Sequence, residues 1–136
     1  MQLESFGALL ESKGQRAAVK FERVREMYFT RDALEQASSE IVSRYRAGRF
    51  QELGVTSIAD LGCGIGSDTL SLCRVGKVTG VEWNPRRLAM AQENLQVYEL
   101  ASRFHPLKAD LIELSPLKVE ALFADPGRWD EYGGRV

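Results

Sequence analysis

The chain has 136 residues, with 18 Lys and Arg against 19 Asp and Glu and a net charge of −1. Hydrophobic residues make up 44% and charged residues 27%, which excludes an intrinsically disordered chain. The near-neutral net charge does not by itself indicate a nucleic-acid-binding protein. No apolar run reaches membrane-spanning length, and the N-terminus lacks a signal-peptide layout. Cys63 and Cys73 have no partner histidine pattern, so we expect no metal site and a reduced, cytoplasmic setting.

Residues 1–50 are predicted to form an N-terminal helical segment. Apolar side chains recur at helical spacing in residues 3–12, and residues 16–27 predict a second helix with a basic face. That face is either an RNA-contacting surface or, as we favour, a solvated helix face. Thr30 is a good N-cap, and it precedes one long predicted amphipathic helix that ends near Gly48. The apolar face of this helix contains Ala33, Leu34, Ala37, Ile41, Val42 and Tyr45.

A strand, a glycine turn and a helix follow one another in residues 56–74. The apolar residues 56–61 predict a buried strand, and Gly62, Gly64 and Gly66 follow it at alternate positions. In α/β folds such a turn brings backbone close to a ligand. The spacing differs from the dinucleotide fingerprint, whose third glycine would fall at Ser67. Asp60, at the end of the strand, suits a cationic or hydroxylated ligand better than a phosphate.

Three further strands are predicted downstream. Residues 77–82 form the second strand and end in Glu82, an acidic position that typically binds ribose hydroxyls. Asn84 and Pro85 then start a helix that extends to about residue 100. Residues 103–108 form the third strand, before Asp110. Residues 119–124 form the fourth strand.

These motifs carry a resemblance to a known family. The stretch Asp60-Leu61-Gly62-Cys63-Gly64-Ile65-Gly66 resembles motif I of class I S-adenosylmethionine (SAM) dependent methyltransferases, and the likeness in motif order extends over residues 28–128. It implies an α/β, Rossmann-like class I methyltransferase fold. Only strands 1–4 of seven, in the order 3-2-1-4, would be present. Residues 51–136 would then be a SAM-binding half-domain with an incomplete C-terminus, so we expect a truncated chain.

The resemblance is closer to one bacterial group and extends to a more distant one. Residues 17–21, residues 29–38 and the Asp-Pro-x-Arg element at 125–128 look like bacterial THUMP-like methyltransferases. Trimethylguanosine synthases are similar at a greater distance. These relatives imply an RNA guanine substrate, although Asp-Pro-Gly-Arg departs from the Asn-Pro-Pro-Tyr type of motif IV. Such a departure predicts a changed substrate.

The resemblance also implies roles for individual residues. Asp125 and Pro126 would orient the substrate amine for attack on the methyl group, with Arg128 or Trp129 near the substrate. Trp83 would cover the adenine, although it is as readily explained as a core residue. The cofactor SAM would be bound by Thr30, Asp60, Gly62, Gly64, Gly66, Asp68, Glu82, Trp83, Asp110 and Leu111.

Three functions remain open on the sequence. The leading one is the cofactor part of a SAM-dependent RNA methyltransferase. The second is a non-catalytic SAM-binding module that a partner completes. The third, a nucleotide-cofactor oxidoreductase, is disfavoured by the glycine spacing. Because the fourth strand is apolar and would lie at the border of the sheet, we also expect pairing there with a copy of the chain or with its missing half.

Overall fold

The structure, a computed structural model, describes residues 21–125. Its centre is a parallel sheet in the order β3-β2-β1-β4. The strands are β1 (Ser57–Leu61), β2 (Lys77–Glu82), β3 (Phe104–Lys108) and β4 (Ala121–Ala124). This order confirms the predicted partial Rossmann-like fold. The predicted helix at 3–12 lies outside the described residues, and the division of the chain at residue 50 stays a prediction.

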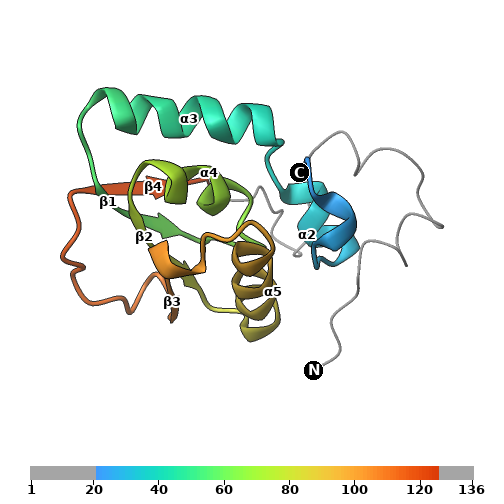
Figure 1. Ribbon diagram of the computed structural model, residues 1–136. Helices are drawn as coiled ribbons and strands as arrows, with labels where there is room; N and C mark the ends of the chain where they lie inside the picture. The colour runs from blue at the N-terminus through green and yellow to red at the C-terminus, as the bar shows by residue number, and fades with distance from the viewer. Residues whose placement is uncertain (1–20, 126–136) are drawn as a thin grey trace.

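Helices α3 (Glu40–Glu52), α4 (Ser67–Val75) and α5 (Pro85–Val97) pack against the sheet (Figure 1). Ile58 of β1 and Val78 of β2 lie opposite each other in register, and both belong to the core cluster that these helices form with the sheet. The start of α5 is as predicted. Pro85 is the first helical residue, and the Asn84 side chain accepts hydrogen bonds from the backbone N–H groups of the next two, Arg86 and Arg87. The other buried members of this cluster that come from the three helices are Ala47, Leu70, Leu72, Cys73, Met90 and Leu95.

The helix predicted over residues 16–27 is wrong in its described part. Only a short 3-10 turn, Val24–Glu26, is present between residues 21 and 27. The backbone N–H of Arg23 donates to Tyr98 Oη at 2.9 Å, and that of Tyr28 donates to Asn94 Oδ1 at 2.7 Å. Met27 is fully buried. Side chains of α5 and its C-cap thus bind backbone groups that a helix would have used internally, and the segment lies along α5.

The predicted long helix from Thr30 to Gly48 is also wrong, because it is two helices, α2 (Arg31–Gln36) and α3. Ser39 separates them, and its Oγ accepts a hydrogen bond from the backbone of the third residue of α3. The predicted apolar face of α3 is turned to the outside: Ile41 is 81% exposed. Ser43 is buried instead and lies 2.9 Å from Ser71 of α4, oxygen to oxygen. Small polar residues therefore form this helix contact, and hydrophobic periodicity does not detect them.

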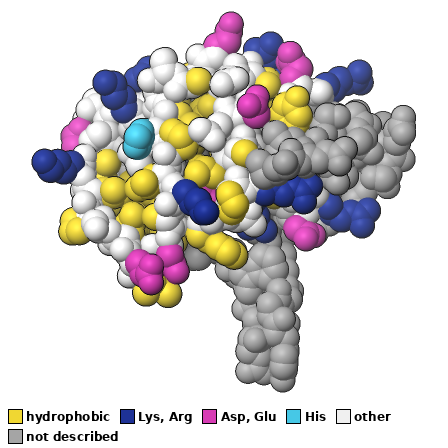
Figure 2. Space-filling view, turned by 90° about the horizontal axis from the view of Figure 1, so that it is seen from below, with side chains coloured by type: hydrophobic (Ala, Val, Ile, Leu, Met, Phe, Trp, Pro, Cys, Tyr) yellow, Lys and Arg dark blue, Asp and Glu magenta, His cyan; other side chains and the backbone are white. Residues whose placement is uncertain are grey.

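Strand β4 forms a border of the sheet within the described residues, where it pairs only with β1. Leu122 in the middle of β4 is 62% exposed. Hydrophobic side chains also gather on the face of the molecule shown in Figure 2. Apolar strand edges invite pairing with another chain, and large apolar patches are unusual on monomers.

We therefore expect the chain to self-associate through β4 or to require a further strand there. Light scattering over a concentration series should show a mass that rises with concentration. Leu122→Lys should lower that mass, whereas Ile41→Lys on α3 should not. A strictly monomeric chain whose amides at 119–124 exchange rapidly with solvent would contradict the expectation.

Candidate functional site

The turn between β1 and α4 is built around glycines in the left-handed region. Gly62, Gly64 and Gly66 have φ values of 76°, 57° and 90°, which side-chain-bearing residues rarely adopt. A Cβ at Gly66 would approach Leu95 Cδ2 at 3.1 Å, so this glycine also permits the close approach of α5. The backbone N–H groups of Gly62 and Cys63 donate to Val81 O at 2.8 and 3.0 Å. The turn is thereby held against the end of β2.

Beside this turn lies a cavity of about 250 Å³ at the carboxyl ends of β1, β2 and β4. We call it the carboxylate cavity, because Asp60, Asp68, Glu82 and Asp125 all line it. Arg87 is the only cation among the lining residues that the structure describes. Such a lining attracts positively charged and hydroxylated ligands and repels a pyrophosphate.

Most of the sequence-predicted site residues meet at this cavity, and a few do not. Asp60, Gly62, Gly64, Asp68, Glu82, Trp83, Leu111 and Asp125 line it. Gly66 lies at the start of α4 behind the turn, and Asp110 follows β3, outside the described lining. Thr30 lines a different hollow, and its Oγ1 accepts a hydrogen bond from the N–H of Ala33 at 3.2 Å. Pro126 lies outside the described residues. The binding and catalytic roles of this set stay predictions.

Glu82 is fixed in place by backbone on both sides. It is 5% exposed, and its Oε1 accepts from Gly64 N–H at 3.1 Å while Oε2 accepts from Asn84 N–H at 2.9 Å. The first bond joins the end of β2 directly to the glycine turn. An ionised carboxylate has about four acceptor positions, so two remain for a ligand's hydroxyl groups. Glu82 is therefore a rigid acceptor, suited to a diol.

Asp60 is the most deeply buried of the four carboxylates, with 3% of its surface exposed. Burial raises the pKa of Asp60 to about 7, against the hydrogen bond that Thr69 Oγ1 donates to Oδ2 at 2.6 Å. The neighbouring Asp68, Asp125 and Glu82 raise the pKa further by repulsion. A cationic ligand would reverse this repulsion and favour the ionised form.

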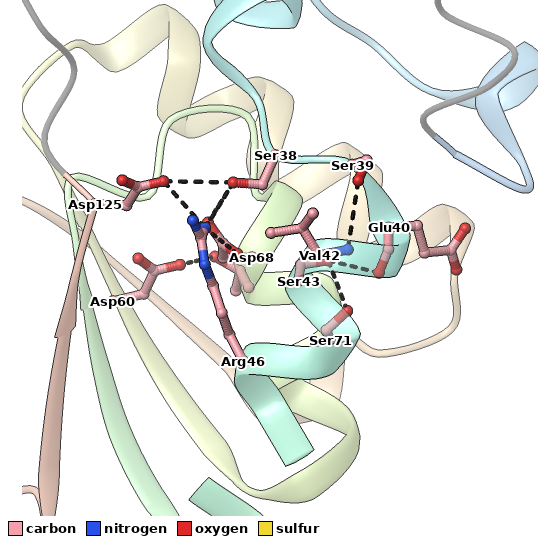
Figure 3. A network of polar contacts seen from close by, with 11 residues as sticks. Ser38, Ser39, Glu40, Val42, Ser43, Arg46, Asp60, Asp68, Ser71 and Asp125 are labelled. Atoms are coloured by element: carbon pink, nitrogen blue, oxygen red, sulfur yellow. Dashed lines mark hydrogen bonds and ion pairs between the residues drawn. The ribbon is translucent and has the colours of Figure 1, made fainter. Parts of the chain in front are cut away.

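Arg46 of α3, which the sequence analysis did not identify, joins two of the carboxylates (Figure 3). Its Nη1 lies 3.1 Å from Asp68 Oδ1, 3.1 Å from Asp125 Oδ2 and 2.7 Å from Ser38 Oγ. The guanidinium also lies 5.6 Å from the ring centroid of Phe123. Burial raises the pKa of the Asp68 carboxyl, and Arg46 opposes that rise. No motif spacing connects residues 46, 68 and 125, so only the fold reveals this network.

Removal of the Arg46 charge should destabilise the protein. Arg46→Ala leaves Asp68, whose side chain is 10% exposed, without its cation, and we expect a loss of about 1–3 kcal/mol at pH 8. The loss should shrink at acid pH, where Asp68 becomes neutral. Arg49→Ala is the matched control, because its side chain is 64% exposed and lies 3.9 Å from Glu52, and it should cost under about 0.5 kcal/mol. Urea unfolding at both pH values measures this, and equal losses for the two variants would contradict the role of Arg46.

The sequence and the structure are similar to those of several known proteins. The chain is 34% identical over 79 residues to the 23S rRNA (uracil(1939)-C(5))-methyltransferase RlmD of Acidithiobacillus ferrooxidans, covering 57% of this chain and 18% of that protein. It is 32% identical over 96 residues to an uncharacterised SAM-dependent methyltransferase of Mycobacterium tuberculosis, covering 65% of this chain and 26% of that protein. The structure also resembles the N-terminal domain of EvdMO1 with S-adenosylhomocysteine (SAH) bound. The TM-score is 0.56 at 29% identity, over 70% of this chain and 40% of that one.

The sheet order and these likenesses identify the fold as that of class I SAM-dependent methyltransferases, as predicted from motif I. More narrowly, the chain belongs to the RNA cap guanine-N2 methyltransferase family, which its residues 55–125 match. The matched segment runs from just before β1 to just after β4. The chain spans only 18% and 26% of the length of the two curated relatives above. The finer likeness to the THUMP-like group stays a prediction.

Proposed function

We propose that this chain is the cofactor-binding part of a methyltransferase that acts on RNA, and that SAM occupies the carboxylate cavity. The observation that carries the proposal is Glu82, whose two oxygens are oriented by backbone N–H groups at the end of β2. An acidic residue at that point in an α/β sheet accepts a hydrogen bond from a ribose hydroxyl, and Glu82 offers two fixed oxygens for it. The left-handed glycine turn beside it leaves room for the rest of the ligand.

The charges around the cavity support the orientation of the cofactor. SAM has an ammonium and a sulfonium group, both positive, and a single carboxylate. Asp60 of β1 and Asp68 of α4 both line the cavity, where they would attract the positive groups, while Glu82 would bind the ribose. Trp83 lines the rim and is 69% exposed, so its ring is accessible to the adenine.

Asp125 is the candidate for contact with the substrate. It directly follows β4, its side chain is 46% exposed, and Arg46 fixes one of its oxygens at 3.1 Å. A carboxylate held in this way can accept a hydrogen bond from a nucleobase amine and align it with the methyl group. Positioning supplies most of the rate enhancement in such a transfer. A guanine target is supported by the family to which the chain belongs. The rRNA substrate of one relative, which is methylated at a uracil, supports RNA as the substrate class but not guanine as the base.

Two binding measurements and one activity assay test this function. SAH should bind by calorimetry while NAD should not, because the cavity lining repels a pyrophosphate. Preferential binding of NAD would instead support the oxidoreductase. Methyl transfer from labelled SAM to total RNA should be detectable with the natural full-length protein. If SAH binds but no RNA, whether total or fractionated, accepts methyl groups, the non-catalytic module completed by a partner becomes the better description.

The location of the protein is proposed from its chemistry. Cys63 and Cys73 are both buried free thiols, which supports a reducing cytoplasm. Within residues 21–125 no helix is long and apolar enough to cross a bilayer.

A further inference from the structure

A second hollow lies where α2 and α5 begin. Its volume is about 420 Å³, and its lining includes Thr30, Arg31, Asp32, Asn84, Arg86 and Arg87. We call it the arginine hollow. Arg87 lines the carboxylate cavity as well, so the two spaces are neighbours with a shared wall. Asp32 is the only acidic residue in the described lining, which also includes the three arginines Arg31, Arg86 and Arg87.

These arginines occupy positions that are unfavourable for helix stability. Arg31 is the first residue of α2, and Arg86 and Arg87 are the second and third residues of α5, whose first turn has no acidic residue. A helix N-terminus repels cations, and helices α3 and α4 have Glu40 and Asp68 in their first turns. In α2 the second residue, Asp32, offsets Arg31, whereas Arg86 and Arg87 have no acidic residue in the same turn of α5.

The guanidinium groups, rather than the helix ends, provide the binding groups. Asn84 Oδ1 already accepts the backbone N–H groups of Arg86 and Arg87, at 3.0 and 3.3 Å. A guanidinium presents a planar fork of donors that matches the oxygens of a phosphate. Because the whole chain has a net charge of −1, this positive group is a local feature and not part of a generally basic surface.

We propose that Arg31, Arg86 and Arg87 bind phosphate groups of the RNA strand whose base enters the carboxylate cavity. This proposal rests on the proposed function. Arg87 lines both spaces, so a phosphate bound in the arginine hollow would lie next to the carboxylate cavity, where the base reacts. Phosphate contacts set the register of a nucleic acid without reading its sequence. The arginine hollow would thus position the strand, and the carboxylate cavity would perform the chemistry.

The test compares RNA affinity across salt concentrations in variants of the hollow. Arg31→Gln/Arg86→Gln removes two charges and leaves Arg87, which also lines the carboxylate cavity. Each lost phosphate contact on a single strand should lower the slope of log affinity against log salt by about 0.7, so we expect a decrease of about 1.4. The melting temperature of the variant is compared with that of the wild type, so that a loss of folding is not taken for a loss of RNA binding. Arg49→Gln is the control. Arg49 is exposed near the C-terminal end of α3 and does not line the hollow, so this variant should keep the wild-type slope.

The outcomes separate this inference from the function on which it rests. If SAH binds the variant normally but the salt slope for a short single-stranded RNA equals that of the wild type, the arginine hollow is not a phosphate site. If the wild-type protein fails to bind SAH, the proposed function is wrong whatever the RNA result. If wild-type protein binds no RNA, or if poly-glutamate competes as well as RNA, the assignment to an RNA strand is overturned.

Discussion

Asp60→Asn should stabilise the protein at pH 8 while it weakens binding of SAM. The carboxyl of Asp60 has its pKa raised from 3.8 to about 7, chiefly by burial. A difference of this size between the folded and unfolded states corresponds to a cost of up to about 4 kcal/mol once the group is ionised. Asparagine has nearly the same shape, can still accept the hydrogen bond from Thr69, and has no charge to desolvate.

The sign of the pH dependence follows from the direction of the shift. Because the pKa is higher in the folded state, the unfolded chain loses this proton first as the pH rises. Stability is therefore lost between about pH 4 and pH 7, and the full cost is present above pH 7. The gain from Asp60→Asn should be largest at pH 8 and nearly absent at pH 4. Urea unfolding at the two pH values measures it.

The exposed Glu52 provides a control for this substitution. Glu52→Gln also changes a carboxylate into an amide, at a side chain that is 76% exposed, and it should alter stability by less than about 0.5 kcal/mol at either pH. In the wild type, SAM affinity should rise as the pH increases through 7, because the ionised Asp60 attracts the cofactor's ammonium. If the Asp60→Asn protein is no more stable than the wild type at pH 8, burial of the ionised Asp60 carboxylate does not destabilise the protein.

Glu82→Ala should weaken SAH binding by about one to two orders of magnitude. A charge-assisted hydrogen bond contributes about 1.5–3 kcal/mol, and tenfold in affinity corresponds to about 1.4 kcal/mol. The substitution also leaves the N–H groups of Gly64 and Asn84 without their acceptor, so the glycine turn should become less ordered. Calorimetric titration with SAH measures the loss.

Two further variants separate the ribose role from the structural one. Glu82→Gln retains one acceptor oxygen, and its affinity should fall between that of the wild type and that of the alanine variant. Glu52→Ala removes a carboxylate whose side chain is 76% exposed at the end of α3, and it should leave SAH affinity unchanged. SAH binding by Glu82→Ala at wild-type strength would exclude the ribose assignment.

The site elements that could be predicted from the sequence are those encoded within a few residues. The strand that ends at Leu61, the three alternating glycines and the Asn84-Pro85 helix start each depend on local geometry, and the structure has all of them. Parallel strands place their carboxyl ends at one edge of a sheet. The sequence order alone therefore brings Asp60, Glu82 and Asp125 to the same cavity.

The segment before β1 could not be predicted, because its conformation depends on distant partners. The backbone N–H groups of Arg23 and Tyr28 donate to Tyr98 and Asn94, and the helical periodicity of this segment was misleading. The break at Ser39 depends on a cap and on the contact of Ser43 with Ser71, which is 28 residues away. Local propensity contains no information on such contacts.

What the sequence by itself determined is the class of fold, the glycine turn and the acidic residues at the strand ends. Only the tertiary structure decided that Arg46 joins Asp68 to Asp125, that Glu82 is held by Gly64 and Asn84, and that Thr30 lines the arginine hollow rather than the carboxylate cavity. The physical reason is range. Turns, caps and strand ends are set by neighbouring residues, whereas desolvation and charge pairing arise only once packing brings distant carboxylates and guanidinium groups together.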